Sequence, residues 1–121
     1  MSWYMLCFCC THKVCREEKA GRGYIGQVST TASGKLCQQW SSNTPHVPVF
    51  TDDEFPDGSR EAANNYCRNP DTSWNEGVWC YTMDPDVPRE ACNVPECGTS
   101  YVLFCCSNIS IIMLLSVFII L

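Results

Sequence analysis

The chain has 121 residues, a formal net charge of −5 and 11 cysteines. This length fits one domain and excludes a complete protein kinase, whose two lobes need roughly twice as many residues. The eight Lys and Arg are scattered along the sequence, so no surface for nucleic acid is predicted. Cysteine at about nine per cent of a short chain is typical of a disulfide scaffold made in an oxidising compartment.

The N-terminal segment, residues 1–14, opens with the apolar run MSWYMLCFCC. This run has the length of a short signal peptide, but no basic residue precedes it and no small-residue cleavage pattern follows it. Two interpretations stay open: a short or incomplete signal peptide, and a wrongly assigned first exon. Cys7, Cys9 and Cys10 lie in this run and are assigned no role.

The stretch from Gly21 to Val28 reads GRGYIGQV and matches the pattern of the glycine-rich loop that covers ATP phosphates in kinases. A phosphate-binding loop follows a buried strand and opens a helix. This stretch instead follows CREEKA, precedes STTASG and is enclosed between Cys15 and Cys37. No nucleotide site is therefore predicted, and Gly21 and Gly23 are expected to be ordinary loop residues.

From Thr11 to Cys97 the chain is polar and rich in Gly, Pro, Asn and Asp, and no segment sustains an apolar 3.6-residue period. Short candidate strands, such as VWCYTM at 78–83, alternate with turn signals. The pattern predicts a small disulfide-rich fold, mostly irregular with short β-strands. Its core would be small, and the candidate residues are Trp40, Phe50, Phe55, Tyr66, Trp79 and Tyr81.

Covalent bridges are the expected stabilisation of so small a core. Six cysteines lie in the polar block, namely Cys15, Cys37, Cys67, Cys80, Cys92 and Cys97. Spacing alone leaves fifteen ways of pairing six cysteines. A zinc site is the rival interpretation, but these six contain no C-x-x-C pair, and His12 and His46 are not at ligand spacing. No metal and no cofactor are predicted.

A short linker, residues 98–100, leads into an apolar C-terminal segment, residues 101–121. This segment carries no charge, and as a helix it would span about 31 Å, close to the hydrocarbon thickness of a bilayer. It predicts a transmembrane helix. Three origins stay open: a truncated single-pass protein, a tail-like end and a removable GPI signal. Cys105 and Cys106 are assigned no role.

The residues around the six cysteines of the polar block follow a specific order. Tyr24 to Trp40 reads YIGQVSTTASGKLCQQW, and further along come PH at 45, FP at 55, NYCRNPD at 65, WCYT at 79, DP at 84 and CNVPEC at 92. This order resembles a kringle domain over residues 15–97. The resemblance implies the kringle fold and three nested disulfides, Cys15–Cys97, Cys37–Cys80 and Cys67–Cys92.

Many kringles bind a lysine side chain in a shallow groove, with two carboxylates, aromatic walls and a cation for the ligand's own carboxylate. The resemblance makes Asp71 the first carboxylate of such a groove. Trp79 and Tyr81 stand two apart on the candidate strand at 78–83, so they are expected to share one face. Arg89 stands where a further aromatic wall is expected and would substitute as the cation. The predicted ligand is a protein that presents Lys or Arg side chains.

This groove departs from the family pattern at several positions. The second carboxylate falls near Ser73 or Trp74, unless Glu76 bends in, and the usual cation positions fall near the uncharged Val49 and Pro88. The predicted groove is therefore only partly suited to lysine.

A purely structural interpretation of the same residues stays open. In this interpretation Trp79 packs in the core, Tyr81 is half buried and Asp71 caps the turn after Pro70. The acidic run DDEFPD at 52–57 likewise has two interpretations, a contact for a basic partner and a solvated loop.

The sequence as a whole predicts a single extracellular kringle that binds protein at a cell surface and is tethered to the cell membrane through residues 101–121. Without an authentic C-terminal segment it would be secreted. The arrangement resembles receptor tyrosine kinase-like orphan receptors, which place a kringle just outside the membrane. An alternative is a fragment of a secreted kringle-containing serine protease, in which the kringle localises an absent catalytic domain. No catalytic residues are predicted, because the chain lacks Gly-x-Ser-x-Gly and neither histidine has a carboxylate partner nearby in sequence.

Overall fold

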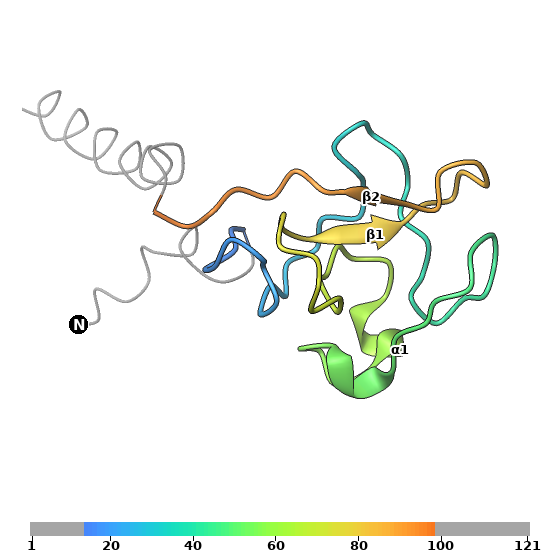
Figure 1. Ribbon diagram of the computed structural model, residues 1–121, viewed down its shortest axis with the longest axis horizontal. Coiled ribbons are helices and arrows are strands. Elements are labelled where there is room, and N and C mark those ends of the chain that lie inside the picture. The colour runs from blue at the N-terminus through green and yellow to red at the C-terminus, as the bar shows by residue number, and fades with distance from the viewer. Residues whose placement is uncertain (1–13, 99–121) are drawn as a thin grey trace, which may run out of the picture.

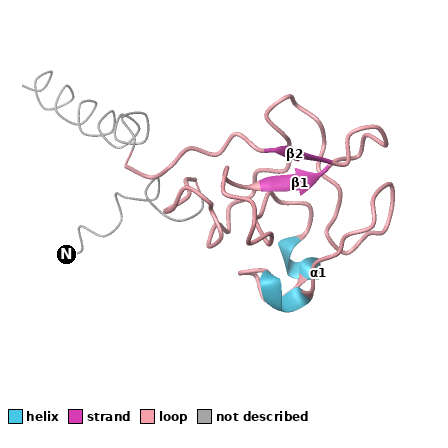
Figure 2. Cartoon of the chain, in the orientation of Figure 1, coloured by secondary structure: helices cyan, strands magenta, loops and turns pink. Residues whose placement is uncertain are grey.

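The computed structural model describes residues 14–98, and most of this region is loop (Figures 1 and 2). Its regular elements are a 3-10 turn η3 at Asp52–Glu54, a helix α1 at Arg60–Ala63, and the strands β1 at Trp79–Tyr81 and β2 at Arg89–Ala91. The predicted fold class, small and mostly irregular with short strands, is confirmed for these residues.

The two strands form one antiparallel ribbon in which Trp79 pairs with Ala91, and Tyr81 pairs with Arg89. β1 is shorter than the predicted strand at 78–83. The ladder ends because the next donor, the Thr82 N–H, reaches the carbonyl of Pro88 at 3.1 Å, and a proline has no N–H to return the second bond.

The four residues of α1 were not predicted, because one turn is too short to display a helical period in the sequence. The side chain of Ser59 caps the helix by accepting a hydrogen bond from the N–H of Ala62 at 3.0 Å. The helix ends at Asn64, whose φ of 54° leaves the helical region. The turn buries Ala63 completely against the core.

Aromatic side chains fill the centre of the domain, with Trp40 in the middle. The Trp40 ring meets Phe55, Trp79 and Tyr81 edge to face at centroid distances of 5.0, 5.2 and 5.6 Å. Of the six predicted core residues, these contacts bury Trp40, Phe55 and Trp79, whereas the remaining three are partly exposed. Four further buried residues of the same cluster were not among these six candidates, namely Tyr24, Ala63, Val78 and Val94.

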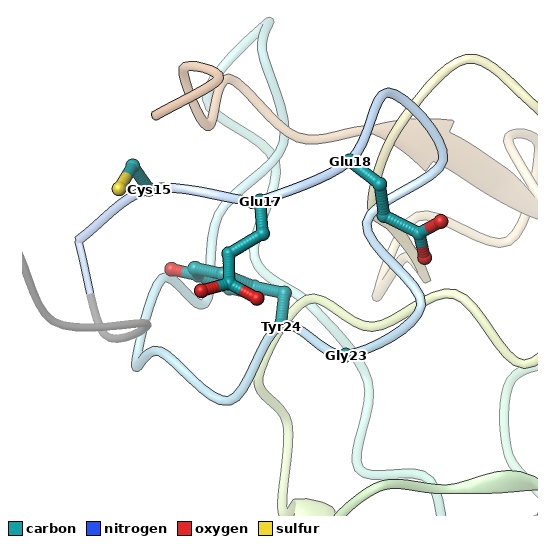
Figure 3. Close-up of a pocket in the computed structure, with 5 residues that line it drawn as sticks. All are labelled: Cys15, Glu17, Glu18, Gly23 and Tyr24. Atoms are coloured by element: carbon teal, nitrogen blue, oxygen red, sulfur yellow. The ribbon is translucent and has the colours of Figure 1, made fainter. Parts of the chain in front are cut away.

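The stretch Gly21–Val28 contains no helix or strand and borders a cavity of about 290 Å³, lined in part by Gly23 and Tyr24 (Figure 3). The prediction that Gly21 is an ordinary loop residue was wrong. Its φ is +70°, and a Cβ atom there would lie 2.8 Å from Cγ1 of Val78, so a side chain would be both strained and obstructed. A Cβ atom on Gly23 would meet nothing within 4 Å.

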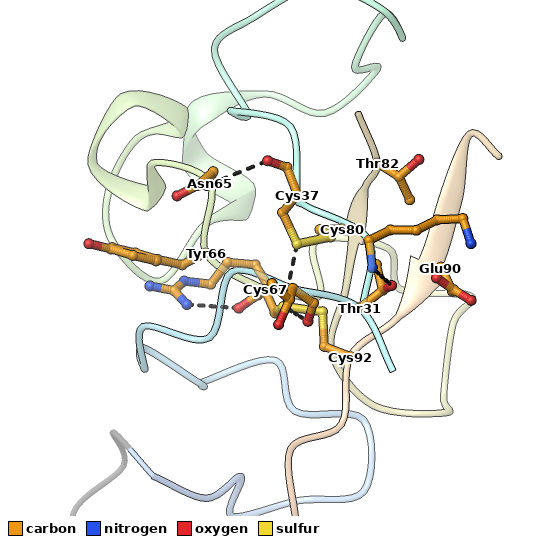
Figure 4. Close-up of a disulfide and its surroundings, with 12 residues drawn as sticks. Thr31, Cys37, Asn65, Tyr66, Cys67, Cys80, Thr82, Glu90 and Cys92 are labelled. Atoms are coloured by element: carbon orange, nitrogen blue, oxygen red, sulfur yellow. Dashed lines mark hydrogen bonds between the residues drawn. A yellow bond between two sulfur atoms is a disulfide. The ribbon is translucent and has the colours of Figure 1, made fainter. Parts of the chain in front are cut away.

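The three predicted disulfides are present, joining Cys15 to Cys97, Cys37 to Cys80 and Cys67 to Cys92. The two inner bridges lie side by side in the core, and Sγ of Cys37 is 3.7 Å from Sγ of Cys67 (Figure 4). The four sulfurs of these bridges lie within 4.8 Å of one another. All four are bonded in pairs, so they offer no thiolates to a metal ion.

Within residues 14–98, no helix is long and apolar enough to cross a bilayer. The predicted membrane segment 101–121, the end of the linker and the predicted signal peptide lie outside the described residues.

Candidate functional site

The strand pairing decides which side chains share the face above β1. Side chains alternate along a strand, so Trp79 and Tyr81 point to one face, and Cys80 points to the other face, where it bonds Cys37. Arg89 is the direct cross-strand partner of Tyr81 and therefore lies on the same face as the two aromatic rings. The predicted juxtaposition of Trp79 and Tyr81 is confirmed, with centroids 5.3 Å apart.

Asn69 fixes the loop that carries Asp71 against β1. Its buried amide donates to the carbonyls of Ala20 at 2.7 Å and Trp74 at 2.9 Å. Its Oδ1 accepts from the indole N–H of Trp79 at 3.1 Å. Because these three bonds satisfy a buried side chain, they hold the loop in one position relative to the strand.

Both carboxylate oxygens of Asp71 have partners. Oδ1 accepts from the N–H and the hydroxyl of Ser73 at 2.9 and 2.6 Å, and Oδ2 accepts from Nη1 of Arg89 at 3.0 Å. The Ser73 hydroxyl, followed by the Ser73 N–H and the Arg89 guanidinium, holds the pKa of the Asp71 carboxyl below its ordinary value, outweighing the raising effect of burial. The carboxylate is therefore ionised and engaged within its own chain.

Arg89 lies over two indole rings. Its guanidinium carbon is 5.0 Å from the ring centroid of Trp74 and 5.2 Å from that of Trp79, both within cation–π range. We call these five residues, Asp71, Trp74, Trp79, Tyr81 and Arg89, the groove. Trp74 was missed as an aromatic member of it, although the turn from Asp71 to Trp74, closed by a backbone bond of 3.1 Å, is the signal that places it there.

The predicted residues differ in their exposure. Trp79 is fully buried, so it forms the floor of the groove, not a wall. Tyr81 is partly exposed, and His46 stacks beside it with ring centroids 6.3 Å apart. Burial raises the pKa of the Tyr81 hydroxyl, so this tyrosine is neutral at physiological pH. The burial of Trp79, the partial exposure of Tyr81 and the hydrogen bonds from Asp71 to Ser73 match the purely structural interpretation. The ion pair between Asp71 and Arg89 was not part of that interpretation.

The structure places the residues at which the groove departs from the family pattern. Ser73, one predicted position of the second carboxylate, uses its hydroxyl to bind Asp71. Glu76 is exposed, and in the described part of the chain no hydrogen bond or ion pair joins it to the groove. Val49 and Pro88 are exposed and uncharged. The groove therefore contains one carboxylate and one cation, and these two groups are paired with each other.

A second arginine site lies in the interior and was not predicted. Arg68 donates from Nε and Nη2 to the two carboxylate oxygens of Asp57, at 2.7 and 2.8 Å. Its Nη1 donates to the carbonyls of Gly26 and Cys67, both at 2.7 Å. The acidic run at 52–57 is thus divided, since Asp57 is part of this pair and Asp52 binds Arg60.

Two cavities lie away from the groove. The first, described above, is lined by Cys15, Glu17, Glu18, Gly23 and Tyr24. The second, of about 360 Å³, is lined by Leu36, Cys37, Gln38, Gln39, Ser42, Thr44, Asn65 and Met83. No groove residue lines either cavity.

The comparison with protein families identifies the architecture. A family model described as the kringle domain matches residues 15–97, which is more than half of the chain. The chain belongs to the kringle family. Kringle domains are non-catalytic modules that generally bind other proteins.

Proposed function

We propose that this kringle is an extracellular protein-binding module, tethered at a cell membrane, whose groove contacts basic side chains of a protein partner. One observation carries the proposal: the exposed Arg89, the Asp71 carboxylate and the partly exposed ring of Trp74 lie together above the buried ring of Trp79. A carboxylate beside aromatic rings is the environment that a Lys or Arg side chain from a partner would require. Exposed aromatic and arginine side chains are also enriched among residues that dominate binding energies.

The groove is only partly suited to lysine. A lysine ammonium is strongly hydrated and needs several acceptors to replace its water. The groove supplies one carboxylate, and Arg89 and Ser73 already bind it. Free lysine is therefore a weak ligand under this proposal, and a basic segment of a protein partner, which also contacts Tyr81, is a stronger one.

The disulfides support the proposed compartment. Three bridges in a small domain are typical of proteins made in an oxidising environment such as the secretory pathway or the cell surface. Attachment through residues 101–121 stays a prediction from the sequence. The protease-fragment alternative also stays a prediction, and a longer transcript encoding a trypsin-like domain would support it.

Selection from a random peptide library tests the binding function. The oxidised full chain, held in detergent, is the target, and we expect the enriched peptides to contain Arg or Lys. Asp71→Asn and Tyr81→Ala are expected to weaken their binding at least about tenfold, as loss of a central contact does. Leu36→Ala is the matched control, because Leu36 is 55% exposed and lies outside the groove. Peptides without basic residues, or peptides that bind all three variants like the wild type, would contradict the proposal.

Two further measurements test the remaining parts. Immobilised lysine is expected to let the wild-type protein pass, and retention that free lysine analogues release would show that the groove is not degenerate. Protease protection and thiol labelling in cells are expected to place residues 15–97 outside the membrane. Residues 15–97 found in the cytosol with reduced cysteines would refute the proposed location.

A further inference from the structure

The groove binds a ligand from its own chain. The guanidinium of Arg89 makes contacts that an incoming cation would need: Oδ2 of Asp71 at 3.0 Å and the ring centroids of Trp74 and Trp79 at 5.0 and 5.2 Å. The Arg89 side chain is nevertheless 42% exposed. Among the described residues its side chain makes this one hydrogen bond, so most of its five donors have no protein acceptor and the arginine is not fixed in place.

The composition of the site favours a guanidinium over an ammonium. Two aromatic rings and only one carboxylate oxygen are offered to the cation. A guanidinium is planar and weakly hydrated, so it stacks on rings and loses little on leaving water. An ammonium is compact and strongly hydrated, so one shared carboxylate compensates its desolvation less well.

We infer that the groove is a guanidinium-binding site that the chain keeps filled with Arg89, and that a partner engages it by exchanging an arginine side chain for Arg89. This inference rests on the proposed binding function and names the side chain that the groove selects. Arg89 then acts as a tethered competitor, which a partner's arginine must displace. Removal of Arg89 is expected to increase the affinity of the site for a free guanidinium by about tenfold, the combined value of an exposed ion pair and its cation–π contacts.

Chemical rescue of Arg89→Ala tests the inference without any partner. The oxidised full chain is heated with increasing ethylguanidinium, and ethylammonium at equal ionic strength is the comparison. At a concentration equal to its dissociation constant, ethylguanidinium is expected to raise the Tm of Arg89→Ala by about 2–3 °C relative to wild type. Ethylammonium is expected to give less than half of this rise. The wild type supplies the baseline, because guanidinium salts destabilise folded proteins in general.

Two controls separate this site from other arginine sites. Arg60→Ala removes another arginine that is paired with an aspartate, Asp52 at 3.2 Å. Arg60 is partly exposed and has no aromatic ring among its described contacts, so no rescue is expected. Arg89→Ala combined with Asp71→Asn is expected to lose the rescue. Arg89→Met keeps the methylene packing. It replaces Arg89→Ala in the same Tm measurement if the alanine variant does not form its three disulfides.

The outcomes that overturn the inference are specific. An equal rise in the Tm of Arg60→Ala would show a general salt effect. No rise in the Tm of either Arg89 variant would show that the site does not bind guanidinium. An equal rise with ethylammonium would show that the site does not select guanidinium over ammonium. Peptides that still require Tyr81 in the library selection would then support the proposed function without this inference. The inference about guanidinium can therefore fail while the proposed binding function stands.

Discussion

Of the arginine–aspartate pairs in residues 14–98, two also lie over aromatic rings, and these two differ in their burial. Arg68 lies over the rings of Tyr24 and Tyr66 and binds Asp57, and Arg89 lies over two tryptophan rings and binds Asp71. The inner side chains are 1% and 12% exposed, whereas the outer ones are 42% and 16% exposed. The same combination of groups thus occurs once in the interior and once at the surface.

The difference lies in how many donors of each guanidinium are used. Arg68 makes four hydrogen bonds, two to Asp57 and two to backbone carbonyls. Arg89 makes one described hydrogen bond, to Asp71. If a buried cation leaves its site, its acceptors stay buried without a hydrogen-bond donor, which is costly in free energy. An exposed cation with one hydrogen bond can exchange with water or with a ligand. Burial therefore separates an arginine that maintains the fold from one that is available for binding.

The largest expected effect is on the inner pair. Arg68→Met leaves the Asp57 carboxylate and two buried carbonyls without their donor, so the free energy of unfolding is expected to fall by about 3–5 kcal/mol. Arg68→Lys is expected to rescue little, because an ammonium cannot reproduce the two-pronged contact. Urea unfolding with the disulfides intact measures both. A loss as small as that of Arg60→Met, which removes a partly exposed arginine, would show that the inner pair does not stabilise the fold.

The outer pair is expected to contribute much less. A double-mutant cycle with Arg89→Met and Asp71→Asn should give a coupling energy of about 0.2–1 kcal/mol, typical of an exposed pair. The same cycle at Arg68 and Asp57 should give a clearly larger value. Equal coupling energies in the two cycles would remove the distinction between the pairs.

Salt is expected to sharpen the contrast. In 1 M NaCl the Debye length falls to about 3 Å, so the coupling between Arg89 and Asp71 should decrease by about half or more. The coupling between Arg68 and Asp57 should change little, because solvent ions do not reach it. Repeating both cycles at low and high salt checks this, and an outer coupling that does not change with salt would indicate a pair shielded from solvent.

The smallest expected effect is a pH dependence of the outer pair. The folded-state pKa of Asp71 lies below its ordinary value near 3.8, chiefly through the hydroxyl of Ser73. A lowered carboxyl pKa contributes stability that is complete above the ordinary value and is lost as the pH falls through the lowered one. The stability difference between wild type and Asp71→Asn should therefore be constant near neutrality and shrink in acid. A difference that grows on acidification would contradict the assigned direction.

Much of the scaffold could be predicted because its stabilising residues carry a spaced pattern. The six cysteines with their flanking aromatics implied the three bridges, and the alternation around Cys80 placed Trp79 and Tyr81 on one face. These features depend on residue type and local spacing, which a sequence displays directly.

The inner pair and part of the groove could not be predicted, because they depend on contacts between loops. Asp57 lies in an acidic run that looks solvated, and nothing in its neighbours indicates that Arg68 folds onto it. Arg89 was recognised as a cation in an aromatic position, but its closure onto Asp71 requires the register of β1 and β2. Gly21 appeared to be a loop residue, because its obstruction comes from the distant Val78.

The bridge between Cys15 and Cys97 has a mechanical consequence. It holds the first and last cysteines of the domain with their Cα atoms 5.1 Å apart, although they are separated by 82 positions in sequence. A pulling force applied to the chain before Cys15 and after Cys97 passes through this one covalent link and bypasses the strands, the core and the groove. Tension along the chain would therefore leave the groove undistorted, so its affinity for a partner is expected to be the same under load as at rest.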